Sequence, residues 1–233
     1  MSINLQSVLE LGEIKVAGRL VDASNATLFI SITHQEQIVD AIYKPISGER
    51  PLWDFESGNL ASRERAAYIV SEIGNFNLVP LTILREGPFG LGAVQQWVEI
   101  DETIDLAQFF RTEDPRLRAT ALFDAVINNT DRKIGHLLPD LQGRLFICDH
   151  GVTFHHEDKL RTVLWQWAGT ALSSAEITQL RDLLVQVNEN EELKELINLE
   201  EMEALQERIE RLIATSTFPV PNPEWPAVPW PPF

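Results

Sequence analysis

The sequence is poor in features of secreted and membrane proteins. Only one of its 233 residues, Cys148, is a cysteine, so no intrachain disulfide can form. No stretch approaches about 18 consecutive apolar residues, and we therefore expect no membrane span. The first residues lack a basic stretch followed by an apolar block, so we expect no signal peptide. These absences favour a reducing, cytoplasmic location.

Positive charge is also scarce. Nineteen Lys and Arg residues stand against 35 Asp and Glu residues, which gives a formal charge of −16. Such a balance repels phosphate backbones and argues against broad nucleic-acid binding. Much of the acid lies in residues 188–210, where we expect a solvated helix face. The remaining chain is closer to neutral and is compatible with an anionic cofactor.

The first part of the chain is predicted to be rich in strands. Residues 13–45 contain three β-branched, apolar runs separated by turn residues. Helical spacing follows over residues 60–74, with Gly74 as the expected stop. Two further strands are expected on either side of a turn at residues 86–90.

The second part is predicted to be helical. Asp114 and Pro115 suit the cap and the first residue of a helix, and two long helices are expected after residue 172. Residues 218–233 hold seven of the 13 prolines and cannot form a helix or a central strand. We expect this tail to be extended, with Trp225, Trp230 and Phe233 either docked on the body or available to a partner, and docking is the simpler interpretation.

These patterns predict an α+β, two-lobed fold. Residues 1–98 would form a β-rich lobe with one helix, residues 99–217 a helical lobe, and residues 218–233 a Pro/Trp-rich tail. A cleft between two lobes is a natural place for a ligand.

The polar residues between 128 and 154 are typical of phosphoryl transfer. That chemistry needs a cation for the donor phosphates, oxygens for a divalent metal, and a carboxylate that orients the acceptor hydroxyl. Asp131 follows a predicted helix, His136 comes five residues later, and Asp149 ends a predicted strand. Each also has an ordinary interpretation as a turn, strand-end or structural residue. We favour catalysis for Asp131 and metal binding for Asp149, and we leave His136 open between ligand and structural histidine.

The same stretch resembles the phosphatidylinositol 3-/4-kinase-like branch of the protein-kinase superfamily, and actinobacterial phosphatidylinositol-kinase-like proteins in particular. The segment NNTDRKIGHLL is similar to the D-R-H-x-x-N loop of that branch, and ICDHG to its metal-binding aspartate segment. The resemblance extends over roughly residues 12–170. It implies a protein-kinase-like fold that binds ATP with Mg²⁺ or Mn²⁺.

The resemblance also implies roles for individual residues. Lys44 matches the phosphate-binding lysine of the third strand, and Glu64 matches the helix glutamate that pairs with it. Other expected nucleotide contacts are Gln96, Trp97 and Val98 in the segment between the lobes, and Ser24 and Asn25 at the tip of the phosphate-covering hairpin. His136 and Asp149 would hold the metal, Asp131 would orient the acceptor, and Lys133 or Arg132 would neutralise charge on the transferred phosphoryl group.

Departures from the family pattern leave three functions open. Lys133 replaces a histidine, His136 replaces the metal-binding asparagine, and the hairpin is not rich in glycine. The first hypothesis is an ATP-dependent phosphotransferase whose acceptor is a protein, a small molecule or a lipid head group. The second is a nucleotide-binding pseudokinase that acts as a switch or scaffold. The third is an AMP transferase.

Three further features have simpler interpretations. His155 and His156 are expected to be a solvent-exposed pair. Cys148 is expected to be a small core residue, and Trp165 and Trp167 to pack in the core or against the tail.

Overall fold

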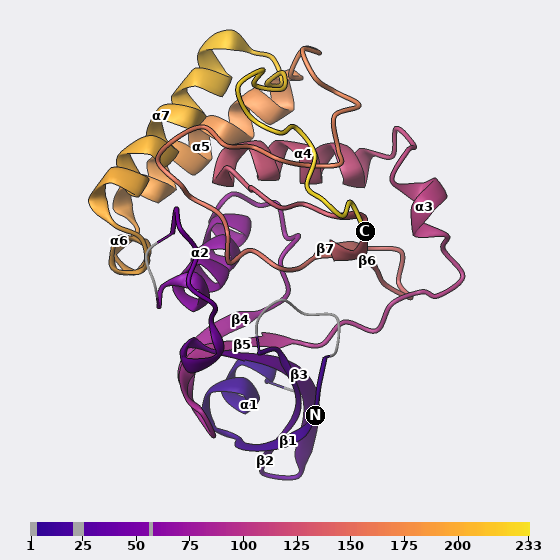
Figure 1. The fold of residues 1–233 in the computed structure, drawn as a ribbon, viewed down its shortest axis with the longest axis vertical. Coiled ribbons are helices and arrows are strands. Elements are labelled where there is room, and N and C mark those ends of the chain that lie inside the picture. The colour runs from indigo at the N-terminus through magenta and orange to yellow at the C-terminus, as the bar shows by residue number, and fades with distance from the viewer. Residues whose placement is uncertain (1–3, 21–25, 56–57) are drawn as a thin grey trace.

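The structure, a computed structural model, describes residues 4–20, 26–55 and 58–233. The fold is α+β, with an antiparallel sheet in the first lobe and mostly helices in the second (Figure 1). The sheet has the strand order β1-β2-β3-β5-β4. Its strands are β1 (Glu13–Arg19), β2 (Leu28–His34), β3 (Gln37–Pro45), β4 (Thr82–Gly87) and β5 (Gly90–Gln96).

A short helix fills the curled face of this sheet. In Figure 1 the strands curve around α1 (Leu5–Leu11), whose Val8 and Leu9 are fully buried against Ile30 and Ile32 of β2. The sequence does not predict α1, because seven residues are too few to show a helical period. Burial of its apolar face, and not intrinsic propensity, stabilises the helix.

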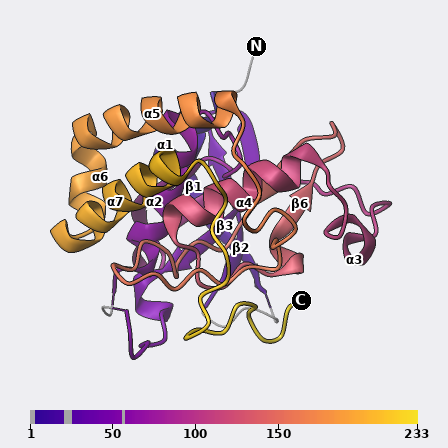
Figure 2. The same cartoon turned by 90° about the horizontal axis from the view of Figure 1, so that it is seen from above.

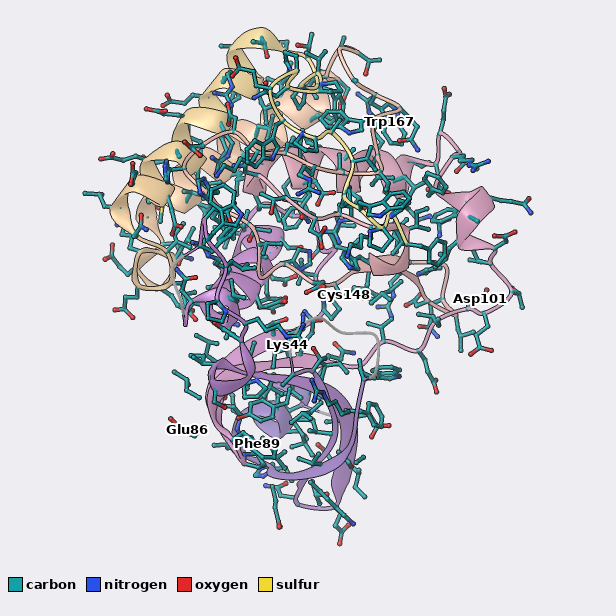
Figure 3. All side chains as sticks on the ribbon, viewed as in Figure 1. Lys44, Glu86, Phe89, Asp101, Cys148 and Trp167 are labelled. Carbon is teal, nitrogen blue, oxygen red and sulfur yellow. The ribbon has the colours of Figure 1, made fainter. Side chains whose placement is uncertain are left out.

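The pleat of β3 directs Lys44 into the space between the lobes. Successive side chains of a strand point to opposite faces. Tyr43 is fully buried in the core around α1, so Lys44 faces the other way, toward α2 (Leu60–Ile73). Figure 3 shows Lys44 where the sheet meets the second lobe, below Cys148.

Helix α2 lies between the sheet and the second lobe, and it buries two charged residues. Arg63 bonds to the carbonyl oxygen of Thr153 and to Glu201, while Glu64 turns toward Lys44. The short 3-10 turn η1 (Ile46–Gly48) precedes the loop that leads to α2. The helix ends at Gly74, as the sequence predicts.

The second lobe is built on helices that pack around one core. Asp114 caps α4, as predicted, where its Oδ1 accepts a hydrogen bond from the Arg116 N–H, and Ser173 caps α5. Figure 2 shows α5 and α7 side by side next to α4. The helices of this lobe are α3 (Leu106–Phe109), α4 (Pro115–Ile127), α5 (Ser174–Glu189), α6 (Glu191–Leu196) and α7 (Leu199–Thr215).

A small hairpin follows α4 and carries the candidate site. The 3-10 turn η2 (Ile134–His136) leads into β6 (Leu137–Pro139), which pairs with β7 (Leu145–Ile147). The strand that Asp149 is predicted to end corresponds to β7, which stops earlier, at Ile147. Among the described residues, no helix is both long and apolar enough to cross a membrane.

The C-terminal tail docks on the second lobe, as predicted, but its hydrogen bonds to the body are accepted by backbone carbonyl oxygens. The carbonyl oxygen of Ala227 accepts hydrogen bonds from the Thr162 N–H at 3.1 Å and from the Trp165 Nε1–H at 2.8 Å. Farther along, the carbonyl oxygen of Pro232 accepts from the Ile134 N–H at 2.9 Å. Trp230 remains 86% exposed, so docking covers only part of the tail's aromatic surface. The domain limits at residues 98 and 217 remain predictions.

Candidate active site

Three charged residues from distant parts of the chain meet between the lobes. Lys44 comes from β3, Glu64 from α2, and Asp149 from the segment directly after β7. The Lys44 ammonium forms an ion pair with Glu64 Oε1, and its Nζ lies 3.1 Å from Asp149 Oδ1. Glu64 is buried, whereas the Asp149 side chain is 56% exposed. The cation is therefore held from the protein side while one of its carboxylate partners faces solvent.

Mutual attraction keeps all three groups charged. Burial alone would raise the pKa of Glu64, but the neighbouring Lys44 outweighs it, and the pKa falls to about 2. Burial alone would lower the pKa of Lys44, but Asp149 and Glu64 raise it above its ordinary value. The ammonium of Lys44 also holds the pKa of Asp149 well below its usual range. At neutral pH the cluster is one cation between two carboxylates.

The backbone at Asp149 has an unusual conformation. Its φ is 63°, in the left-handed region that residues other than glycine rarely adopt. Strain of this kind persists only where the surroundings enforce it, and it concentrates at functional sites. The preceding residue supplies the restraint, because the Cys148 N–H donates to the His136 carbonyl oxygen and its own carbonyl oxygen accepts from Arg132.

Asp131 lies in the loop after α4, beside a lysine. Its N–H donates to Asn129 Oδ1 at 2.9 Å, and its Oδ2 lies 3.2 Å from Lys133 Nζ. Burial raises the pKa of the Asp131 carboxyl above its ordinary value, with Lys133 acting in the opposite direction. A carboxylate with a raised pKa is a better proton acceptor.

His136 faces Asp149 and is neutral at physiological pH. Burial lowers the pKa of its imidazole to about 4. Its Nδ1 accepts a long hydrogen bond of 3.4 Å from the Lys133 N–H, and its Nε2 lies 3.4 Å from Asp149 Oδ2. Because Nδ1 accepts, Nε2 carries the proton in this arrangement.

These residues fit a divalent metal with one adjustment. Nε2 of His136 and Oδ2 of Asp149 are close enough to share an ion, but a metal needs the Nε2 lone pair. The imidazole proton must then move to Nδ1, which sacrifices the hydrogen bond from Lys133. That bond is long and therefore weak.

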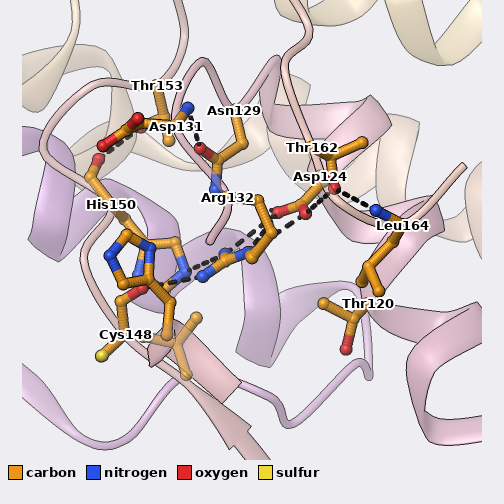
Figure 4. A network of polar contacts seen from close by, with 12 residues as sticks. Thr120, Asp124, Asn129, Asp131, Arg132, Cys148, His150, Thr153, Thr162 and Leu164 are labelled. Atoms are coloured by element: carbon orange, nitrogen blue, oxygen red, sulfur yellow. Dashed lines mark hydrogen bonds and ion pairs between the residues drawn. The ribbon is translucent and has the colours of Figure 1, made fainter. Parts of the chain in front are cut away.

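The role predicted for Arg132 as a phosphoryl-neutralising residue needs correction. Its side chain is fully buried, and its guanidinium donates to both carboxylate oxygens of Asp124, at 3.0 and 3.1 Å (Figure 4). A third bond goes to the Cys148 carbonyl oxygen at 2.8 Å. The guanidinium is committed to the interior and is not available to a ligand, so of the two predicted cations only Lys133 faces the site.

A relative and a solved structure resemble the chain. It is 38% identical to Protein Rv2133c of Mycobacterium tuberculosis over 264 aligned residues, which cover 97% of this chain and 95% of the relative. The chain belongs to the Rv2133c family. No model of a known protein family matches it. The crystal structure of the Helicobacter pylori proinflammatory kinase CtkA has a similar fold, with a TM-score of 0.50 and 11% identity, over 90% of this chain and 94% of that chain.

The likeness to CtkA shows that this Rv2133c-family chain has a kinase-like fold, and no more than the fold at so low an identity. The narrower likeness to phosphatidylinositol kinases remains a prediction. The roles of the individual site residues also remain predictions.

Of the three nucleotide contacts expected between the lobes, one has a backbone N–H without a hydrogen-bond partner among the described residues. The N–H groups of Gln96 and Trp97 donate to Leu81 and Asp40 carbonyl oxygens, at 2.8 and 3.1 Å. Within the described residues, the Val98 N–H has no hydrogen-bond partner. Trp97 is 39% exposed and packs edge-on against Phe29. Ser24 and Asn25, the predicted hairpin tip, lie outside the described residues.

A hollow surrounds Lys44 and includes residues that sequence motifs do not mark. Glu49 lies in the loop after η1, and its Oε1 accepts a hydrogen bond from the Ala61 N–H at the start of α2. Its other carboxylate oxygen is buried without a hydrogen-bond partner among the described residues. Only the folded position of this loop reveals Glu49 as a neighbour of the cluster. The residues lining the hollow are Ala26, Thr27, Lys44, Pro45, Glu49, Leu60, Ala61, Glu64, Asp149 and Gly151.

The prediction of an exposed histidine pair is wrong for one member. His155 is buried, and its Nδ1 accepts a hydrogen bond from the Glu157 N–H at 3.0 Å. Its ring stacks on that of the exposed His156. One potential metal-ligand atom from each of His155, His156 and Glu157 lies within 4.8 Å of the other two, but the Nδ1 bond already uses one ring nitrogen of His155.

Proposed function

We propose that this Rv2133c-family protein is an ATP-dependent phosphotransferase. The observation that carries the proposal is the position of Lys44, held by buried Glu64 and 3.1 Å from solvent-facing Asp149. A lysine fixed on one side and paired on the other with a potential metal ligand is what a triphosphate site needs. The kinase-like fold supports the proposal without specifying the reaction.

ATP would bind across the cleft between the lobes. Lys44 would contact the phosphates, with Glu64 keeping its ammonium in place. The unpartnered Val98 N–H and the exposed face of Trp97 would receive the adenine. A planar base suits this surface, because it stacks on an aromatic ring while its edge accepts a backbone hydrogen bond.

Asp149 and His136 would hold a divalent ion. When bound, Mg²⁺ or Mn²⁺ supplies positive charge against the phosphate oxygens. An imidazole in the ligand set favours Mn²⁺ over Mg²⁺, because Mg²⁺ prefers oxygen ligands. On binding the metal, Asp149 would weaken its ion pair with Lys44, so that the Lys44 ammonium could contact the phosphates.

Asp131 would orient the acceptor hydroxyl and take its proton. Its raised pKa suits a base, and its N–H bond to Asn129 keeps the loop in place. Lys133, 3.2 Å from Asp131, would offset the charge on the transferred phosphoryl group. The acceptor hydroxyl remains open between a protein, a small molecule and a lipid head group.

ATP turnover tests the proposal directly. We would measure ADP formation and intact mass after incubation with ATP and either metal, for the wild type and Asp149→Asn. The control is Asp158→Asn, which removes an exposed carboxylate paired with Arg211. We expect turnover in the wild type and the control, with a loss of at least about 100-fold in Asp149→Asn.

Other outcomes identify the rival functions. Nucleotide binding in a thermal-shift assay without turnover under either metal would contradict the enzyme and favour a pseudokinase. Addition of an adenylyl group in place of a phosphoryl group would indicate AMP transfer. If the protein bound no nucleotide, the phosphotransferase, the pseudokinase and the AMP transferase would all be excluded.

A further inference from the structure

His150 occupies a buried position between the two lobes that the proposed chemistry does not use. It follows Asp149, in the place where the kinase D-F-G segment has phenylalanine, and it is fully buried. Its Nε2 lies 2.9 Å from Arg132 Nη2, and its Nδ1 lies 3.8 Å from Glu64 Oε2. Figure 4 shows the imidazole against the Arg132 guanidinium, on the side away from Asp124.

The partner of Nε2 decides the tautomer of His150. Arginine stays protonated in proteins and only donates, so Nε2 must be the acceptor. A neutral imidazole then carries its proton on Nδ1, the nitrogen that faces the Glu64 carboxylate.

The two facing atoms are both buried and both lack a partner. Neither His150 Nδ1 nor Glu64 Oε2 has a hydrogen bond among the described residues. A buried donor or acceptor without a hydrogen bond costs folding free energy. A hydrogen bond between His150 Nδ1 and Glu64 Oε2 would remove this cost for both atoms. Their separation of 3.8 Å exceeds a hydrogen bond by about 1 Å. A small shift of α2 toward the second lobe would satisfy both.

We propose that His150 is a positioning residue that ties Glu64, and through it Lys44, to the interior of the second lobe. The proposal rests on the nucleotide site proposed above. Asp124 fixes Arg132 through both carboxylate oxygens, Arg132 fixes the ring of His150, and His150 presents Nδ1–H to Glu64. Glu64 then holds Lys44, so the lysine is placed by both lobes when the hydrogen bond closes.

The His150 side chain also has a simpler role. The His150 ring packs edge-on against Phe123, with ring centroids 6.0 Å apart, so it contributes volume to the core. If His150 only fills space in the core, its substitution should affect the binding of ATP and adenosine equally. If it positions Lys44, its substitution should weaken the binding of ATP alone. Poor placement of Lys44 weakens contacts to phosphates and leaves the adenine contacts unchanged.

The test compares ATP with adenosine by calorimetry in wild type, His150→Phe and His150→Gln. Phenylalanine keeps the aromatic volume but has no polar atoms, whereas glutamine offers an acceptor and a donor in one amide. We expect His150→Phe to raise the dissociation constant for ATP with Mn²⁺ by roughly tenfold, and that for adenosine by less than about twofold. His150→Gln should keep ATP affinity within about threefold of wild type. Equal ATP affinity in wild type and His150→Phe, or equal losses in both variants or for both ligands, would overturn the proposal.

A second measurement needs no variant and no nucleotide. Nitrogen-15 chemical shifts of His150 in the folded wild-type protein distinguish a proton on Nδ1 from a proton on Nε2. We expect the Nδ1–H form, and an Nε2–H form or an imidazolium would overturn the proposal even if the variants do not fold. If the wild type binds neither ATP nor adenosine, the proposed function fails, while the tautomer still decides whether His150 donates to Glu64.

Discussion

Lys44 Nζ lies 3.1 Å from Asp149 Oδ1, although 105 residues separate them in the chain. The pair joins the β-rich lobe to the hairpin of the helical lobe. It also means that, without nucleotide, the lysine is already neutralised by two carboxylates. In the proposed function, a triphosphate with its metal would replace one of these contacts, because the metal would attract Asp149 and the phosphates would attract Lys44. Binding would therefore exchange charge pairs and would not have to bury a new, unpaired charge.

Removing the lysine should destabilise the protein even without ligand. Lys44→Met leaves buried Glu64 as an uncompensated negative charge near Asp149, and we expect a loss of about 3 kcal/mol in the free energy of unfolding at pH 7. The double variant Lys44→Met/Glu64→Gln should recover more than half of that loss. Urea unfolding followed by circular dichroism measures both. If the double variant lost more stability than Lys44→Met alone, the ion pair between Lys44 and Glu64 would not account for the loss.

Turnover should depend on pH through Asp131. The base must be ionised to accept a proton, and burial raises its pKa above the ordinary value of 3.8. The acid limb of the kcat/KM profile should therefore have a midpoint above 3.8, with activity lost as the pH falls through it. Asp131→Asn should remove most of the activity, and with it this limb. A limb at or below the ordinary value would contradict the assignment.

His136 should make stability fall in mild acid. Its pKa is lowered from 6.5 to about 4, so between these values the unfolded chain binds a proton that the folded protein does not. The stability is fully present above pH 6.5 and is lost as the pH falls toward 4. For this one group we expect about 1 kcal/mol less stability at pH 5.5 than at pH 7.5 in metal-free buffer. The measurement compares wild type with His136→Asn, using the exposed His156→Asn as a control. Equal pH dependence in all three would refute it.

Local pattern in the sequence placed the elements that carry the site, and the family resemblance supplied the pairing. The pattern puts Lys44 at the end of a strand and Glu64 on the next helix, but only the resemblance to kinases indicated that the two residues form a pair. Arg132 differs, because its role depends on Asp124. That aspartate belongs to α4, and nothing in a helical period reveals that one polar residue is fully buried. The partners of His150 come from two lobes, and only the folded structure brings them together.

Substitution of Arg132 should lower the stability of the protein, because the residue forms a buried ion pair with Asp124. If Arg132 were catalytic, its substitution would instead lower activity and leave stability unchanged. Arg132→Ala leaves Asp124 charged and buried, and we expect a loss of about 3–5 kcal/mol. Arg132→Lys cannot reach both oxygens as the planar guanidinium does, and it should be intermediate. Thermal denaturation without nucleotide provides the measurement. A variant that keeps wild-type stability but loses turnover would restore the catalytic interpretation.

The tail should restrain the loop that carries Asp131 and His136. Trp165 and Thr162 both donate to the Ala227 carbonyl oxygen, and farther along the tail Pro232 accepts from the Ile134 N–H, between Asp131 and His136. Trp165→Phe removes one donor and keeps an aromatic ring, which should cost about 1 kcal/mol. If the tail transmits that loss, hydrogen exchange at the Ile134 amide should become roughly fivefold faster, since this amide exchanges only when its bond to Pro232 opens. Trp53→Phe, at an exposed ring outside the tail, is the control. Unchanged exchange at Ile134 in Trp165→Phe would mean that the two ends of the tail dock independently, and that the loop is held by its own hydrogen bonds to Asn129 and the Cys148 segment.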